Sequence, residues 1–194
     1  PFQNRIKIGS SVSSITPRNE IILESGERET FDRVISAAHG DQSLYLLASP
    51  TELERKILSA FSYQSNKAIL HTDAQFMPQT KRCWASWNYR VDGDRHSTIY
   101  WMNSLQGATA KKDFFVSINP SRRIPNEHII KELEYDHPLF DLNSLAAQKE
   151  VPKLNAANTG RYFCGAWQRF GFHEDGLWSA FRLCKQLLGR SPWS

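Results

Sequence analysis

The sequence has few cysteines and no long hydrophobic run. Its three cysteines, Cys83, Cys164 and Cys184, are an odd number without CxxC spacing, which argues against a disulfide framework and against a zinc site. We therefore expect a reducing, cytoplasmic location and no bound metal. No apolar stretch approaches the roughly 20 residues needed to cross a bilayer, and the chain opens without a secretory signal pattern, so no integral membrane segment is expected.

Two further patterns are absent. The ten glycines never fall at G-x-G-x-x-G spacing, the signature of the strand-turn-helix that grips the pyrophosphate of a dinucleotide. The formal net charge is +4, but the basic residues occur in scattered pairs such as Lys111-Lys112 and Arg122-Arg123. Because a nucleic-acid site needs clustered lysines and arginines on one face, no nucleic-acid partner is expected.

The composition is that of a globular chain, with 40% hydrophobic and 12% aromatic residues. Residues 12–15 and 20–25 read as strands of a meander, and the unalternating segment 30–38 predicts a strand inside a parallel or mixed sheet. A short helix is expected over 41–47. A second helix is expected after Ser49, with Ser49 as the cap, Pro50 in the first turn and Glu52 completing a capping box.

The middle of the chain predicts strands at 67–73, 83–91, 95–103 and 113–119. Asp92-Gly93 is typical of a two-residue hairpin turn, which would place Trp87 opposite Thr98. Trp87, Tyr89 and Tyr100 would then share one face of the sheet, with Trp84, Ile99 and Trp101 on the other. Beyond it we expect helices at 125–135 and 142–151, the latter stopped near Pro152, a strand at 160–167, and a last helix from about Gly176.

The segment GFHEDGL, residues 171–177, lies between that strand and the last helix. The start of a helix offers unpaired N–H groups and a partial positive charge, which favour an anion or a partially anionic ring. Gly171 and Gly176 would let the backbone approach such a ligand. The alternative interpretation is that Glu174 and Asp175 only cap their own helix.

Several longer motifs carry a family resemblance: FDRVISAAHGDQSLYLL, YQSNKAILHTD, CWASWNY, IYWMNSLQ, FFVSINP, YDHPLFD and YFCGAWQRFGFHEDGLWSAFRLCKQL. From about residue 6 to residue 188 the chain resembles the C-terminal part of flavin-containing amine-oxidase-like proteins, in the group described as predicted NAD/FAD-binding oxidoreductases. The resemblance implies an α+β or α/β fold, namely the C-terminal fragment of a split FAD-binding fold plus a mixed or antiparallel sheet substrate domain with flanking helices. The implied domains are 1–48 (FAD-binding), 49–154 (substrate) and 155–194 (closing strand and helix of the FAD-binding domain).

The resemblance also implies FAD as the cofactor and places its contacts. The backbone of Gly176 and Leu177 would lie by the N1/O2 edge of the flavin, where a helix dipole favours electron density on the reduced ring. Gly165 and Ala166 would approach the ribityl-phosphate region, and Val12 the adenine. The full set of expected cofactor-binding residues is Val12, Ala37, Gly165, Ala166, Glu174, Asp175, Gly176 and Leu177.

An aromatic wall would bind the substrate, with ordinary core packing as the alternative for each of its members: Trp84, Trp87, Tyr89, Tyr100 and Trp101. The catalytic residue is left unassigned among three candidates. His173 would lie beside the flavin, and His71 pairs with Asp73 in LHTD, where a structural histidine is the competing interpretation. Lys67 is the nearest match to the lysine that amine oxidases place near flavin N5.

The function expected by resemblance is that of a fragment of an FAD-dependent oxidoreductase, which moves a hydride equivalent from an apolar or amine substrate to flavin. Its partners would be a small-molecule substrate and the missing N-terminal FAD-binding segment of the same protein; a homo-oligomer is left open. The alternatives are a flavin-dependent isomerase or desaturase acting on a lipid-like substrate and a cofactor-free binding module. Nucleic-acid binding by base stacking comes last.

Overall fold

The computed structural model describes residues 3–107 and 111–193. The chain divides into two compact units: unit 1 contains the residues up to Tyr63 and from Pro138 onward, and unit 2 is Gln64–His137. Unit 2 is narrower than the expected substrate domain, 49–154, because the helices at both ends of that range pack in unit 1. The assignment of the units to cofactor and substrate stays a prediction.

Unit 1 opens with a short 3-10 turn, η1 (Gln3–Arg5), and the expected antiparallel meander of β1 (Val12–Ile15), β2 (Glu20–Leu23) and β3 (Arg28–Thr30). The next strand, β4 (Val34–Ser36), pairs in parallel with β10 (Arg161–Phe163). Val34 lies opposite Arg161, which is 127 residues later in the sequence. The prediction that 30–38 contains a strand in a parallel arrangement is therefore confirmed. The expectation that this strand lies inside a sheet, buried on both faces, is wrong, because the sheet has two strands and Ile35 is 47% exposed.

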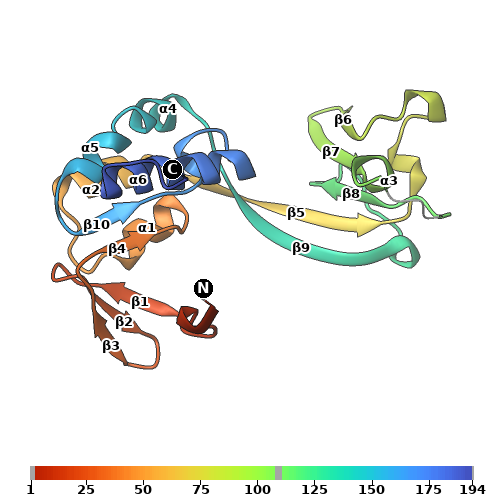
Figure 1. Ribbon diagram of the computed structural model, residues 1–194. Coiled ribbons are helices and arrows are strands. Elements are labelled where there is room, and N and C mark those ends of the chain that lie inside the picture. Colours follow the sequence, from red (N-terminus) through yellow and green to blue (C-terminus); the bar gives the residue numbers. More distant parts are fainter. Residues whose placement is uncertain (1–2, 108–110, 194) are drawn as a thin grey trace. The chain divides into compact units, whose positions relative to one another are not determined.

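Helices surround this parallel pair (Figure 1). They are α1 (Gly40–Leu46), α2 (Glu52–Leu58), α4 (Leu142–Gln148), α5 (Val151–Ala156) and α6 (His173–Leu188), with the 3-10 turn η5 (Ala166–Gln168) between β10 and α6. The apolar sides of α1, α2, α4 and α5 form one core with the strands, whereas Leu183 of α6 packs in a separate cluster with Tyr162 and Cys164. The buried members of the shared core are Ile15, Val34, Leu47, Ile57, Leu58, Phe61, Ala147, Val151, Leu154, Phe163 and Trp167.

Two expectations about where helices begin and end were wrong. The cap of α2 is Thr51, whose side chain accepts the N–H of Glu54 while the Glu54 carboxylate accepts the N–H of Thr51, so the capping box lies two residues after the expected Ser49–Glu52 box. Pro152 does not stop a helix but sits in the first turn of α5, where its missing N–H has no intrahelical partner to lose.

A buried ion pair ties α2 to β10. Glu54 and Arg161 are 1% and 4% exposed, and Arg161 Nη2 lies 2.8 Å from Glu54 Oε2. The same carboxylate oxygen accepts the N–H of Thr51 at 2.7 Å. Glu54 therefore completes the capping box of α2 and is also the counter-ion of Arg161, in the strand that leads to the last helix.

Unit 2 is built on an antiparallel sheet with strand order β6-β7-β8-β5-β9. Short turns of helix connect the strands: η2 (Ala74–Phe76), η3 (Lys81–Cys83), α3 (Met102–Leu105) and η4 (Asn126–His128). The strands are β5 (Tyr63–His71), β6 (Trp87–Asp92), β7 (Arg95–Trp101), β8 (Phe115–Ile118) and β9 (Ile129–Pro138). A second core of Ile69, Phe76, Met77, Ile99, Phe115 and Ile124 covers one face.

The helix expected at 125–135 is wrong. Only residues 126–128 form a 3-10 turn, and the remainder is β9, which lies beside β5 in the sheet (Figure 1). Ile129 and Leu133 have the i, i+4 spacing of a helix, but Ile129, Ile130 and Tyr135 favour a strand wherever a partner edge is present. The edge of β5 provides that partner, so the long-range pairing determines the structure.

The hairpin register differs from the expectation by two residues. Trp87 pairs with Tyr100, Tyr89 with Thr98 and Asp92 with Arg95, so the two turn residues are Gly93 and Asp94, with Gly93 at φ 61°. A glycine at the first central position is the type II′ preference. Because side chains alternate with period 2, a shift of two leaves each side chain on the predicted face.

Candidate functional site

The carboxyl ends of β4 and β10 lie side by side in unit 1. The N–H of Cys164 donates to Ser36 O at 3.0 Å, and Trp167 Nε1 donates to Ala38 O at 3.1 Å. Since the strands are parallel, Ala37 and Gly165 leave the sheet at the same edge. In open parallel sheets, ligands bind in the crevice outside this edge.

Gly165 is required by the fold itself. Its φ is 153°, and a Cβ at this position would lie 2.5 Å from Nε1 of Trp167, which is fixed in the core against Phe61 with 4.5 Å between ring centroids. Its N–H donates to Ser179 Oγ at 2.9 Å. The absence of a side chain at Gly165 therefore has a packing reason and needs no ligand.

The last helix begins at His173 rather than near Gly176, and the expected boundary was three residues late. The carboxylate of Asp175, which is buried, accepts the N–H groups of Phe170 and Phe172 at 3.2 and 3.1 Å. Arg169 Nη1 lies 3.4 Å from its other oxygen. Asp175 therefore closes the loop before its own helix, as the self-capping interpretation describes, whereas Glu174 and His173 are exposed.

Gly176 lies within the first turn of α6. Its N–H donates to Phe172 O at 3.2 Å, so the N–H groups that precede the first intrahelical bonds are those of His173 and Glu174. A Cβ on Gly176 would find its nearest neighbours, the Cβ and N of Ala166, at 3.9 Å. Glycine costs a helix about 1 kcal/mol relative to alanine, and nothing in the packing of the described residues requires it here.

Apolar side chains surround this turn. Phe172 and Leu177 are 69% and 50% exposed, and Phe170 is also exposed. The ring of Phe140 lies against Gly171, 3.4 Å from where a Cβ would stand. The first turn of α6 thus combines Gly176, where no packing contact excludes a side chain, with a rim of exposed apolar side chains.

His39, at the same edge of the sheet, was missed by the sequence reasoning. It follows β4 and stacks on Tyr63 with ring centroids 4.4 Å apart. Tyr63 Oη accepts the N–H of Gly40 at 2.9 Å, and burial raises the pKa of Tyr63 to about 12. Among the described residues, His39 Nδ1 is buried without a hydrogen-bond partner. The sequence signal that could have identified His39 is the pair His39-Gly40, which comes three residues after the end of β4.

Val12 lies apart on the meander. It is half-buried in β1 and lines a hollow of about 150 Å³ with residues of β2 and the adjoining loops, including Ile21, Leu23 and Phe31. Val12 is therefore placed beside a small apolar concavity, in the same unit as the other expected cofactor-binding residues.

The five aromatic residues of the expected substrate wall do not share one surface. Trp87 and Tyr89 are 54% and 56% exposed and stack with centroids 6.3 Å apart, and Tyr100 pairs with Trp87 on the same face. Trp84 and Trp101 lie on the opposite face, edge to face at 5.2 Å, and pack against the core of unit 2. Only Trp87, Tyr89 and Tyr100 can line one wall.

The remaining catalytic candidates also lie in unit 2. His71 is fully enclosed, with Nε2 2.8 Å from Ser117 Oγ and Nδ1 accepting the N–H of Asp73 at 3.2 Å, and burial lowers its pKa to about 4. These contacts are those of a neutral structural histidine. Lys67 is exposed and forms an ion pair with Glu132 at 2.8 Å.

Within residues 3–107 and 111–193, no three His, Cys, Asp or Glu side chains are grouped as a metal site would require. The helices described there are also too short or too polar to cross a membrane.

Neither a family model nor a curated protein sequence matches this chain. Solved structures do match in fold. One is a reduced UDP-galactopyranose mutase, with TM-score 0.63, 13% identity and coverage of 92% of this chain and 47% of that one. Another is a CLA-producing fatty acid isomerase from P. acnes, with TM-score 0.62, 12% identity and coverage of 91% and 47%.

A third is a putrescine oxidase redesigned in its cofactor binding, with TM-score 0.61, 9% identity and coverage of 94% and 49%. The chain spans about half the length of each of these structures. At these identities the likeness shows the fold alone. It confirms the expected fold class: the chain has a mixed architecture, with a parallel pair, an antiparallel sheet and flanking helices, shared with proteins named as a mutase, an isomerase and an oxidase.

Proposed function

We propose that this chain provides one side of an FAD site in a flavin-dependent oxidoreductase, with the flavin ring at the first turn of α6. The observation that carries the proposal is Gly176, a helical glycine at which a Cβ would meet only ordinary van der Waals contacts, with the nearest atoms of Ala166 at 3.9 Å. A residue that weakens its helix and fills no packing role is explained if a ligand occupies the space where that Cβ would stand.

The residues at the strand edge fit such a group. The positive end of α6 suits the electron-rich side of a reduced ring, and the apolar rim of Phe172 and Leu177 suits its flat faces. Ala37 and Ala166 have small side chains and follow the ends of β4 and β10. His39 offers a buried nitrogen without a protein partner. When bound, flavin supplies the redox chemistry by accepting a hydride equivalent from the substrate.

The protein's own residues would place the substrate and exclude water. Trp87, Tyr89 and Tyr100 form an apolar wall without a charged side chain among them, which suits an apolar substrate better than a strongly charged one. His173, exposed at the first position of α6, is the candidate to hold or move a proton. The contacts of His71 favour a structural role, and Lys67 forms an ion pair with Glu132.

A flavin-dependent isomerase is the second candidate. It is supported by the same apolar wall and by the fold shared with a mutase and a fatty acid isomerase as well as with an oxidase. Both functions use the same cofactor site, so they differ only in whether an external acceptor is reduced.

The pyrophosphate of FAD would need a Gly-rich turn, which the printed sequence lacks. We therefore propose that another segment of the same protein supplies it. The experiment is to express the complete gene product and record its visible spectrum. Flavin absorption supports the proposal, and a colourless protein that does not take up added FAD contradicts it and favours the cofactor-free binding module.

Turnover separates the two flavin functions. Peroxide or another reduced acceptor formed from amines or unsaturated fatty acids indicates the oxidoreductase, whereas product formation without net consumption of an oxidant indicates the isomerase. Denatured protein carrying the same amount of free FAD is the control for chemistry by the cofactor alone.

A further inference from the structure

Unit 2 contains a basic hollow that the proposed flavin chemistry does not use. Its volume is about 580 Å³, within the range of small-molecule sites, roughly 300–1,000 Å³. Four cationic side chains line it, Lys67, Arg95, Arg122 and Arg123, against one acidic side chain, Glu132. Lys67 is already paired with Glu132 at 2.8 Å, so the three guanidinium groups remain as net positive charge.

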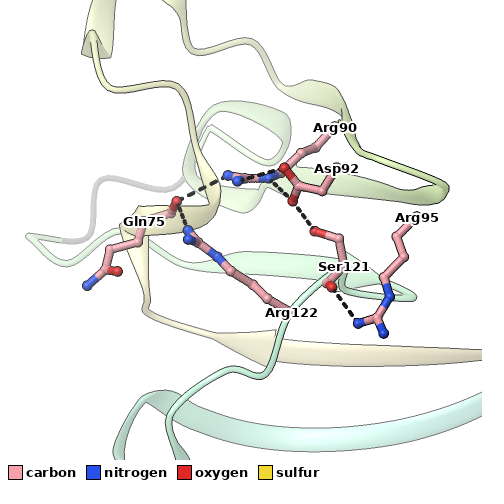
Figure 2. Close-up of polar contacts among 6 residues, drawn as sticks. All are labelled: Gln75, Arg90, Asp92, Arg95, Ser121 and Arg122. Carbon is pink, nitrogen blue, oxygen red and sulfur yellow. Dashed lines mark hydrogen bonds and ion pairs between the residues drawn. The ribbon is translucent and has the colours of Figure 1, made fainter.

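Arg122 and Arg123 stand on the loop after β8, and contacts of the adjoining Ser121 tie this loop to Asp92 and to Arg95 of β7 (Figure 2). Ser121 is 5% exposed, its hydroxyl donates to Asp92 Oδ2 at 2.5 Å, and its carbonyl accepts from Arg95 Nη1 at 3.1 Å. Asp92 in turn accepts from Arg90 Nε at 2.6 Å, and these bonds lower the pKa of Asp92 to about 2. The loop is therefore tied to the β6–β7 hairpin.

Arg122 is held in a defined position. Its Nη2 donates to Gln75 O, and its guanidinium stacks on the Phe76 ring at 4.8 Å. Arg123 makes one long contact, 3.4 Å to Asn126 Oδ1. Each of these two guanidinium groups donates one N–H to a described protein acceptor. A guanidinium group has several N–H donors in a planar fork that matches phosphate oxygens. Because these positioned N–H donors outnumber their described protein acceptors, they favour a ligand that provides hydrogen-bond acceptors.

The hollow is separate from the aromatic wall. Arg95 and Lys67 alternate along their strands with the residues of the Trp87–Tyr100 face and lie on the core side, together with Ile69 and Ile99. The sheet therefore stands between the basic hollow and Trp87, Tyr89 and Tyr100. A molecule in the hollow cannot be the one bound against that wall.

We propose that this hollow binds a phosphate-bearing anion, a phosphomonoester or a diphosphate, through Arg95, Arg122 and Arg123. A group with two or more negative charges balances three guanidinium groups better than a single carboxylate does. Ile69 and Ile124 at the floor of the hollow contact the organic part of the ligand. This proposal does not depend on the proposed flavin site, because none of the residues of the hollow belongs to that site.

Binding of pyrophosphate to this chain, measured by titration calorimetry at low ionic strength, tests the proposal. We expect Arg122→Gln and Arg123→Gln each to weaken binding by about tenfold or more, because a hydrogen bond between charged groups is lost. Arg82→Gln, an exposed arginine on the η3 turn outside the hollow, should change it less than about twofold. Both tested arginines are exposed, so the folded state should persist, and amide spectra of each variant check it.

A second arm identifies the source of the anion. Vesicles of phosphatidylcholine with phosphatidic acid are compared with vesicles of phosphatidylcholine alone, using the same variants. Pyrophosphate binding that is lost in Arg122→Gln supports a soluble phosphate ligand; binding only to the acidic vesicles, lost in the same variant, supports a lipid headgroup. The proposal is overturned if neither probe binds, or if Arg82→Gln reduces binding as much as Arg122→Gln and Arg123→Gln do.

Discussion

Ser179 joins the end of β10 to the first turn of α6: its hydroxyl accepts the N–H of Gly165 at 2.9 Å and donates to Gly176 O at 2.8 Å. The side chain is 2% exposed. This single hydroxyl fixes the distance between the strand edge and the helix start, the two parts of the proposed flavin site.

Replacing Ser179 by alanine should destabilise the protein by about 1–3 kcal/mol, because the N–H of Gly165 is left without an acceptor in a largely buried place. Urea unfolding measures the loss. Ser62→Ala, at an exposed position of the same unit, should remain within about 0.5 kcal/mol of the parent. Equal stability of Ser179→Ala and the parent would show that the bridge is not formed in solution.

Two glycines that look alike in sequence should respond in opposite directions to alanine. Gly165→Ala places a methyl group on the indole of Trp167 and should cost more than about 1 kcal/mol through strain. Gly176→Ala has room and gains helix propensity, so the free energy of unfolding should rise by up to about 1 kcal/mol. A lower free energy of unfolding for Gly176→Ala would contradict this prediction, because it would mean that the first turn of α6 has no room for a methyl group.

The pair Glu54–Arg161 predicts strong coupling. Arg161→Leu alone leaves a buried carboxylate without its counter-ion and should cost about 3–5 kcal/mol, and Glu54→Leu also removes the acceptor of the α2 cap. The double variant should lose less than the sum of the two single losses. Additive losses in a double-mutant cycle would contradict a direct buried contact.

His71 predicts a pH dependence of stability. Burial lowers its pKa in the folded state to about 4, below the value near 6.5 of an unfolded histidine. Between these values the unfolded chain binds the additional proton, so the free energy of unfolding should fall as the pH is lowered, by up to about 1.4 kcal/mol per pH unit. Urea titrations at several pH values measure the slope.

The matched control for this slope is an exposed histidine. His71→Gln should flatten the dependence between pH 6.5 and 4, because the titrating group is gone, whereas His173→Gln should retain it. If His71→Gln shows the same pH dependence of stability as the parent protein, another titrating group causes that dependence.

Local signals predicted most of the elements, and long-range contacts account for the errors. The helix after Pro50 and the strand at 34–36 depend on capping and on an unbroken apolar run, which are readable locally. Residues 129–138 contain helical spacing and become a strand only because β5 offers an edge. The hairpin faces were right despite a wrong register, because the error was an even number of residues.

The candidate site was predictable only in part. The motif at 171–177 predicted the start of α6 three residues late, at Gly176 instead of His173. Ser179 carries no sequence signal, since a serine inside a helix is usually exposed. His39 was overlooked because its significance depends on which strand edge it follows. The separation of Trp84 and Trp101 from Trp87 was predicted from alternation along the strands, yet all five aromatic residues were named as candidates for the substrate wall.

Flavin retention by Gly176→Val in the complete gene product tests the central claim most directly. Valine and glycine differ by less than about 0.5 kcal/mol in helix propensity, so the stability of the cofactor-free protein should be nearly unchanged while the side chain fills the space assigned to the ring. The account predicts a folded, colourless protein beside a yellow parent. A Gly176→Val protein that folds and keeps its full flavin content would contradict it.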